Sequence, residues 1–146
     1  MGKLIVAIGI LVIGIVTLIY VVNPYQIYKE TSFKSFYENL SSSIKKLDCA
    51  AIYSAKSDSF KAKVRFDYYV LSCEGAKTSL SENINVHRIW VTGNTGYADR
   101  TRISCFSTNC AGEKRIEKRE TKKYLFIGGR WTIQDSDDPL DLTSKQ

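Results

Sequence analysis

The chain has 146 residues, a length typical of one domain of ordinary size. Its formal charge of +6 indicates a moderately basic surface and excludes a strongly polybasic protein. The chain contains four cysteines and one histidine, which limits the metal sites that it could form. Its two prolines argue against a long disordered linker.

The N-terminus carries the clearest signal. Residues 4–22 read LIVAIGILVIGIVTLIYVV and contain no charged side chain. As a helix this stretch would span roughly 28 Å, about the thickness of a bilayer's hydrocarbon core. We therefore predict an uncleaved transmembrane anchor over residues 1–25. A cleavable signal peptide is the alternative, but its apolar region is usually shorter and ends in small residues at a cleavage site, whereas this run ends in YVVNP.

The charges that flank residues 4–22 set the expected orientation. Lys3 and the amino terminus favour a cytoplasmic N-terminus, although Lys29 and Lys34 on the other side weaken this bias. We expect the following domain, residues 26–135, to be extracytoplasmic and the protein to cross the membrane once.

Three helices are predicted after Pro24, which should mark the exit from the membrane helix. The first has an apolar face with three- and four-residue spacing, formed by Phe33, Phe36, Tyr37, Leu40, Ile44 and Leu47. Asp48 is the expected N-cap of a short second helix, CAAIYSA. A third helix is expected after the capping cluster at residues 57–59, with its inner face formed by Phe60, Val64, Tyr68 and Leu71.

Strand patterns begin after Gly75. Two extended runs, residues 83–92 and 96–106, flank the turn GNTG and predict a hairpin. A third run, residues 113–127, is followed by Gly128-Gly129 and a short fourth run, RWTI, and then by an acidic tail over residues 136–146. The predicted fold is therefore α+β: an N-terminal transmembrane helix, then about three helices packed on a curved antiparallel sheet of about four strands.

The cysteines do not have the spacing of a zinc site, because the chain contains no C-x-x-C pair and His87 stands alone. An even number of cysteines in a membrane-anchored chain favours two disulfides, Cys49–Cys73 and Cys105–Cys110, in an oxidising compartment. The alternative is reduced, buried thiols in a domain that faces the cytoplasm. We expect no metal and no cofactor.

A run of charge, EKRIEKRETKK, covers Glu113 to Lys123. Its basic residues form a candidate docking ribbon for an acidic protein partner or lipid head groups: Lys114, Arg115, Lys118, Arg119, Lys122 and Lys123. The alternative is a solvated strand edge, since lysine discourages strand pairing. We do not expect nucleic-acid binding, because acidic residues are interleaved and no aromatic residues alternate with the basic ones.

Three stretches resemble the nuclear-transport-factor-2-like superfamily, a cone of helices on a curved sheet. ENLSSSIKKLDCAAIYSAKSDSF resembles its opening helices, IWVTGNTGYADRTRI its central hairpin and KKYLFIGGRWTI its closing hairpin. The resemblance covers residues 33–133. It implies a pocket inside the cone that some members use for catalysis and many use only for binding or docking.

Enzymes of this superfamily usually carry an Asp/His or Asp/Tyr arrangement inside the pocket. The chain offers six such residues, and nothing in the sequence brings two of them together: Asp48, Asp67, Tyr68, His87, Tyr97 and Asp99. We therefore expect no catalytic residue and no enzymatic activity.

A second family is similar over IYVVNPYQIYKE, which looks like the membrane end of type IV pilin-like proteins. In that family Gly is followed by Phe or a similar residue and then by Glu five residues in, whereas here Lys3 follows Gly2 and Ala7 takes the Glu position. The function expected is a non-catalytic, membrane-anchored binding or docking domain within an envelope or secretion assembly. The alternatives are a small-molecule-binding protein or enzyme that uses the cone pocket, and a pilin-like subunit.

Overall fold

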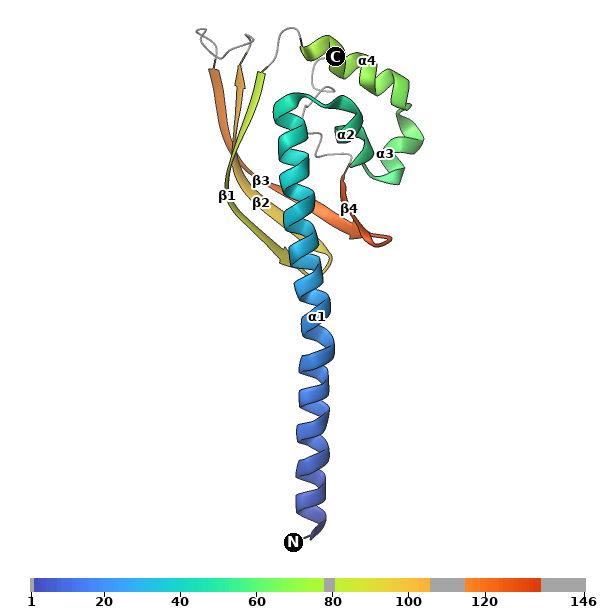
Figure 1. The fold of residues 1–146 in the computed structure, drawn as a ribbon, viewed down its shortest axis with the longest axis vertical. Helices are drawn as coiled ribbons and strands as arrows, with labels where there is room; N and C mark the ends of the chain where they lie inside the picture. Colours follow the sequence, from blue (N-terminus) through green and yellow to red (C-terminus); the bar gives the residue numbers. More distant parts are fainter. Residues whose placement is uncertain (1, 78–80, 106–114, 135–146) are drawn as a thin grey trace. The chain divides into compact units, whose positions relative to one another are not determined.

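The computed structural model describes the backbone of residues 2–77, 81–105 and 115–134, and the side chains of residues 24–75, 83–105 and 116–134. Four helices come first: α1 (Gly2–Lys46), α2 (Cys49–Ser54), α3 (Asp58–Lys63) and α4 (Phe66–Lys77). Four strands follow: β1 (Ser81–Thr92), β2 (Thr95–Cys105), β3 (Arg115–Ile127) and β4 (Arg130–Ile133) (Figure 1). The α+β order and the four-stranded antiparallel sheet are thus confirmed for the described residues. The chain divides into two compact units, Met1–Ser32 and Phe33–Gln146.

In the first unit, helix α1 continues through Pro24 instead of ending there. The first helix expected after Pro24 is thus continuous with the N-terminal helix, because proline removes one backbone hydrogen bond while the neighbouring turns keep theirs. Side-chain pairs four residues apart support the turn after it: Gln26 donates to Glu30 at 3.1 Å, and the Lys29 amino group lies 4.3 Å from the centre of the Tyr25 ring.

Among the described residues, no helix is both long and apolar enough to cross a membrane. The predicted span, residues 4–22, belongs to the part of α1 whose side chains lie outside the described set.

In the second unit, the apolar face predicted for residues 33–47 is confirmed. Its buried members recur every three or four residues: Phe33, Tyr37, Leu40, Ile44 and Leu47. Helix α1 ends where Leu47 adopts a left-handed φ of 50°, and the Asp48 amide donates to the Ser43 carbonyl at 2.8 Å. Asp48 then caps α2, as predicted, by accepting from the Ala51 amide at 3.0 Å.

The predicted third helix is two helices. Ser57 caps α3 by accepting from the Phe60 amide at 3.2 Å, but the chain becomes extended at Val64 before α4 begins. This break changes the face that α4 turns inward: Tyr69 and Cys73 are buried, whereas two residues expected inside are exposed, Tyr68 and Leu71. The prediction assumed one helix with unbroken spacing through residue 64, and it therefore assigned the wrong face of α4 to the core.

The sheet has the order β1-β2-β3-β4, and every neighbouring pair is antiparallel. Gly128 and Gly129 both have positive φ, 58° and 81°, as the two-residue turn between β3 and β4 requires. A bulge interrupts the register of β1 between Val86 and Arg88, so that His87 has no opposite residue in β2.

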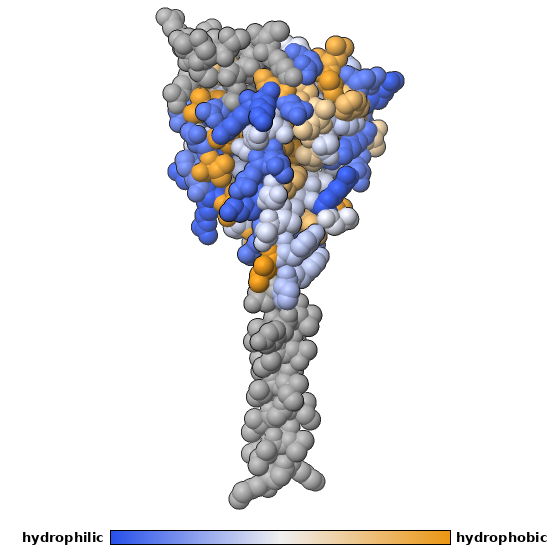
Figure 2. All heavy atoms as spheres, viewed as in Figure 1, coloured by the Kyte–Doolittle hydropathy of each residue, from blue (hydrophilic) through white to orange (hydrophobic). Residues whose placement is uncertain are grey.

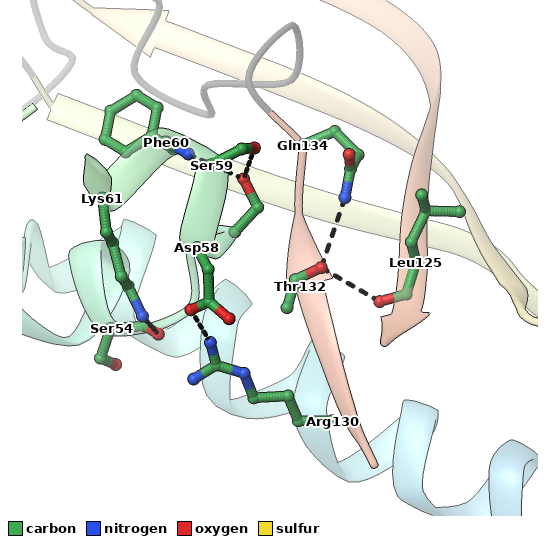
Figure 3. Close-up of polar contacts among 10 residues, drawn as sticks. Ser54, Asp58, Ser59, Phe60, Lys61, Leu125, Arg130, Thr132 and Gln134 are labelled. Atoms are coloured by element: carbon green, nitrogen blue, oxygen red, sulfur yellow. Dashed lines mark hydrogen bonds and ion pairs between the residues drawn. The ribbon is translucent and has the colours of Figure 1, made fainter. Parts of the chain in front are cut away.

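A short backbone bridge ties the helices to β4. The Ile133 amide donates to the Ala55 carbonyl at 2.8 Å, and the Ile133 carbonyl accepts from the Ser57 amide at 3.0 Å. Figure 3 shows side-chain contacts around this junction, including the ion pair between Arg130 of β4 and Asp58 of α3. Strand β4 is therefore covered on both sides, by β3 and by the link between α2 and α3.

Aromatic rings fill the space between α1 and the sheet. The Phe33 ring lies 4.7 Å from that of Trp131 and 5.6 Å from that of Tyr124, centre to centre. At Gly96 in β2 a Cβ atom would stand 2.4 Å from the Phe33 ring, so glycine is needed there. The interior of the cone is consequently a packed core.

The predicted disulfide between Cys49 and Cys73 is confirmed and joins α2 to α4. Cys105, at the end of β2, is also disulfide-bonded, and none of the described cysteines is a free thiol. Cys110, its expected partner, lies outside the described residues.

Candidate functional site

The most distinctive exposed feature is the outer side of β3. β3 pairs with β2 from Arg115 to Leu125, but it pairs with β4 only from Tyr124 to Ile127. Within the described part of the chain, residues 115–123 thus have a strand neighbour on one side only. We call this segment the β3 edge.

The hydrogen-bonding groups of the β3 edge alternate in direction, because successive amides of an antiparallel strand point to opposite sides. The Phe126 amide donates to the Asn94 carbonyl, on the β2 side. Amides of even-numbered residues therefore point to β2, and those of residues 117, 119, 121 and 123 point to the open side. An extended chain laid against this side could therefore add as a further strand.

Basic residues dominate the β3 edge. Residues 115–123 contain five cationic and two acidic side chains, a formal charge of +3. Lys118 and Arg119 are 73% and 68% exposed. Arg119 forms a two-pronged pair with Asp99 of β2, and the hydrogen bond from its guanidinium lowers the pKa of that carboxyl. Of the residues in the predicted ribbon, Lys118, Arg119 and Lys123 are exposed, and Lys122 is half-buried with its amino group 3.8 Å from Glu120; the side chains of Lys114 and Arg115 lie outside the described residues.

A second polar group lies inside the cone, on the face of the sheet that α1 covers. The Arg100 guanidinium is 1% exposed and donates to Oε1 of Glu120, from Nη2 at 2.8 Å and from Nε at 3.1 Å. Tyr37 of α1 approaches the same guanidinium. The Tyr37 hydroxyl and Arg100 Nη1 are shielded from solvent, and neither makes a hydrogen bond of normal geometry within the described structure.

The electrostatics of this buried cluster follow from burial and from the Arg100 charge. Burial raises the pKa of Tyr37 despite the opposing effect of Arg100. Burial also opposes ionisation of Glu120, but the hydrogen bond and charge of Arg100, with help from Lys122 and Arg102, outweigh it and lower the pKa of this carboxyl. Arg100 and Glu120 are therefore both charged at neutral pH.

A groove of about 450 Å³ opens between α1 and β1. Its lining combines an apolar wall from β1 with polar residues of α1: Tyr37, Glu38, Ser41, Ser42, Lys45, Val86 and Ile89. Tyr37 belongs to both the groove and the buried cluster, so this residue separates the groove from Arg100.

Three of the six catalytic candidates lie on the helical layer, away from the groove. Asp48 caps α2. Asp67 forms an exposed ion pair with Arg65 at 2.7 Å, and the Tyr68 side chain is exposed. Each has a structural role or a solvent-facing position.

The other three candidates lie on strands β1 and β2. His87 shares a 2.7 Å hydrogen bond with the Thr101 hydroxyl, and Tyr97 stacks on Trp90 with ring centres 5.1 Å apart. His87 also contributes to the lowered pKa of Asp99. His87 and Asp99 thus lie near each other, and none of the three candidates lines the described groove.

The buried cluster was missed by reasoning from sequence. In the sequence, Arg100 was noted only as a charged neighbour of Asp99. Glu120 lies within the charged run of residues 113–123, which predicted an exposed ribbon. One signal was available: Gly96, Ala98 and Arg100 alternate along β2, which places Arg100 on the same face as two small residues.

Figure 2 shows one face of the described domain, where hydrophilic side chains predominate and apolar patches stand out over α4. The exposed large hydrophobic side chains described in that helix are Phe66, Tyr68 and Leu71. No cluster of three His, Cys, Asp or Glu side chains that could hold a metal ion occurs among the described residues.

Comparison with solved structures identifies the fold. An LEH-like epoxide hydrolase of M. tuberculosis is similar with a TM-score of 0.55 and 14% identity, over 78% of this chain and 86% of that chain. A SEC-C motif protein of Rhodopseudomonas palustris is similar with a TM-score of 0.48 and 13% identity, over 64% of this chain and 68% of that chain. No protein-family pattern and no curated protein matches the chain. The first likeness shows the nuclear-transport-factor-2-like cone, as the sequence resemblance implied, and at this identity it shows the fold alone.

Proposed function

We propose that this protein is a membrane-anchored, non-catalytic docking domain whose β3 edge binds an acidic, extended segment of a partner protein. The observation that carries the proposal is that, within the described part of the chain, residues 115–123 pair with β2 alone and carry a formal charge of +3. An added strand would gain main-chain hydrogen bonds from the open side, and its acidic side chains would complement the lysines.

Two further features support docking rather than catalysis. Aromatic rings fill the interior of the cone, and the six residues suited to catalysis do not meet in the described groove. In contrast, three of the described basic side chains of β3 are exposed: Lys118, Arg119 and Lys123. A filled core beside an exposed ribbon is the arrangement that the docking hypothesis requires.

The location rests on two arguments. The uncharged run at residues 4–22 has the length and composition of a transmembrane helix. The Cys49–Cys73 disulfide supports an oxidising compartment for the domain, since cytosolic pools keep such pairs reduced. A single-pass anchor with a cytoplasmic N-terminus satisfies both, and it would suit a component of an envelope or secretion assembly.

The test is chemical cross-linking of the full-length protein in its native membrane, followed by mass spectrometry of the cross-linked sites. Two variants separate the edge from the rest of the surface. Thr121→Pro removes an amide that points to the open side and leaves the ladder with β2 intact, whereas Thr121→Val keeps the amide. We expect cross-links from the β3 edge to an acidic segment of one partner, lost in the proline variant and kept in the valine variant. Equal cross-linking of both variants would contradict docking at this edge.

Charge at the edge is tested separately. Reversing Lys118 and Lys123 to glutamate should abolish the same cross-links, while reversing two exposed lysines elsewhere, Lys46 and Lys63, should not. If both pairs of reversals have the same effect, general surface charge and not the edge attracts the partner.

A small-molecule-binding protein is the second candidate, favoured by the unsatisfied polar atoms of Tyr37 and Arg100 beside the groove. The expected ligand is a carboxylate with an apolar body that packs on Ile89. Octanoate titrated into labelled protein should shift the Ile89 methyl signals, and Tyr37→Phe should weaken the effect. An unchanged spectrum at millimolar octanoate would contradict this candidate.

The pilin-like subunit is the least supported alternative. Three helices, α2, α3 and α4, stand between α1 and the sheet, and the Gly2-Lys3 sequence departs from the processing pattern of that family.

A further inference from the structure

Three large apolar side chains are exposed on one turn of α1, in the first unit of the chain. Tyr25, Ile27 and Tyr28 are each more than half exposed, although they lie within four consecutive residues. Single exposed apolar residues are ordinary on a protein surface, whereas a group of three on one turn indicates a surface that contacts something apolar. We call these three residues the collar.

The collar is not confined to one side of the helix. Successive residues of an α-helix are rotated by about 100°, so Tyr25 and Ile27 lie about 160° apart around the axis, with Tyr28 between them. A single partner helix packs against one side of α1. An environment that surrounds the helix contacts both sides at once, and such an environment accounts better for the collar.

The collar directly follows the uncharged run of residues 4–22. Pro24 does not interrupt α1, and a helix rises about 1.5 Å per residue, so Tyr25 and Tyr28 lie about 4.5 and 9 Å past Val22 along the axis. If the run fills the hydrocarbon core of a bilayer, the head groups occupy roughly the next 5–7 Å. The Cα–Cβ bonds of a helix tilt toward its N-terminus, so both rings lean back toward that layer.

We propose that the collar lies in the head-group layer of a lipid bilayer and fixes the depth of α1. The inference rests on the transmembrane anchor of the proposed function and adds a lipid-contacting site beyond the anchor itself. Tyrosine suits this layer, because its ring is apolar while its hydroxyl can hydrogen-bond to water and to phosphate. Isoleucine on the other side of the helix adds apolar contact at the boundary with the acyl chains.

The charged residues of the same turn are satisfied within α1. The Lys29 amino group lies over the Tyr25 ring, 4.3 Å from its centre, and Glu30 accepts a hydrogen bond from Gln26 at 3.1 Å. Lys29 and Glu30 also cancel in formal charge. Contacts of the collar, and not attraction to anionic lipids, therefore define this site, and a zwitterionic bilayer is the appropriate probe.

The experiment is fluorine NMR of the full-length protein, labelled with fluorotyrosine and placed in phosphatidylcholine nanodiscs. The signals of Tyr25 and Tyr28 are assigned by their loss in Tyr25→Phe and Tyr28→Phe, and Ile27→Tyr adds a signal on the other side of the helix. Thr31→Tyr is the matched control, because position 31 is exposed and lies about 13.5 Å past the run. Each signal is measured with a nitroxide on the lipid head group and, separately, with a water-soluble gadolinium chelate.

We expect the head-group nitroxide to relax the three collar signals at least about three times more strongly than the control signal, and the chelate to act in the reverse order. Collar signals that respond to the chelate as strongly as the control would overturn the proposal. Relaxation by the lipid nitroxide at Tyr25 but not at Ile27→Tyr would also overturn it, because a protein partner would then cover one side.

The anchor is tested separately by Ile13→Tyr, which lies in the middle of the uncharged run. A nitroxide near the end of the acyl chain should relax this signal more strongly than the head-group nitroxide does. If it does so while the collar signals respond only to the chelate, the anchor stands and the collar is wrong. If Ile13→Tyr responds to neither lipid nitroxide, the anchor is refuted and the collar with it.

Discussion

Replacing Glu120 by glutamine should destabilise the domain strongly, because Arg100 would keep its charge inside the cone without a counter-ion. The guanidinium is 1% exposed and makes two hydrogen bonds to Glu120 Oε1. Removing one partner of a buried ion pair typically costs about 3–5 kcal/mol. We expect about 3 kcal/mol, at the lower end, since the glutamine amide oxygen can still accept one hydrogen bond.

The measurement is urea unfolding of the full-length protein, followed by tryptophan fluorescence at several pH values. The folded-state pKa of Glu120 is lowered from its usual value of 4.5. The carboxylate therefore contributes its full stabilisation above pH 4.5 and loses it as the pH falls through the folded-state pKa. The difference between parent and variant should be largest near pH 7 and shrink in acid.

A double variant distinguishes the effect of the unpaired Arg100 charge from the effect of altered packing. In the double variant Arg100→Met with Glu120→Gln, the stranded charge is gone, so most of the lost stability should return. Two results would refute the reasoning: a Glu120→Gln variant as stable as the parent at pH 7, or a loss of stability that the double variant does not reduce.

Two other changes test the packing and the covalent link. Gly96→Ala should cost about 1–3 kcal/mol, because its Cβ would overlap the Phe33 ring, whereas Gly75→Ala in α4 meets no atom within 4 Å and should be neutral or stabilise by up to about 1 kcal/mol. Equal thermal denaturation temperatures for the two variants would argue against the close approach. Replacing Cys49 and Cys73 by serine opens a loop with a sequence separation of 24, and should cost about 3.5 kcal/mol in urea unfolding; a loss under 1 kcal/mol would show that the disulfide constrains the unfolded chain little.

The sequence was most informative where one local rule controls the outcome. The apolar face of residues 33–47, the cap at Asp48 and the hairpin turns follow from periodicity, capping chemistry and glycine. The four strands were recognisable for a similar reason, because turn residues stand between β1 and β2 and between β3 and β4.

Reasoning from sequence failed where tertiary contacts choose between local options. The disulfide and the burial of Tyr69 set the inner face of α4, and no periodicity in the sequence encodes either constraint. Arg100 was unpredictable for a related reason: a charge on a strand is usually exposed, and only Glu120, twenty residues away, allows this one to be buried.

Helix α4 is joined to α2 and α3 by the Cys49–Cys73 disulfide and by ring contacts of Phe66 and Tyr69 with Tyr53 and Phe60. Tyr69 and Cys73 are its buried residues among those described, and Phe66, Tyr68 and Leu71 are more than half exposed. We expect its stability as a local unit to depend on the covalent bond to α2 as well as on the burial of Tyr69. A reductant should release this helix while the sheet stays folded, so that protease cleavage within residues 66–77 would report the redox state of the compartment in which the protein resides.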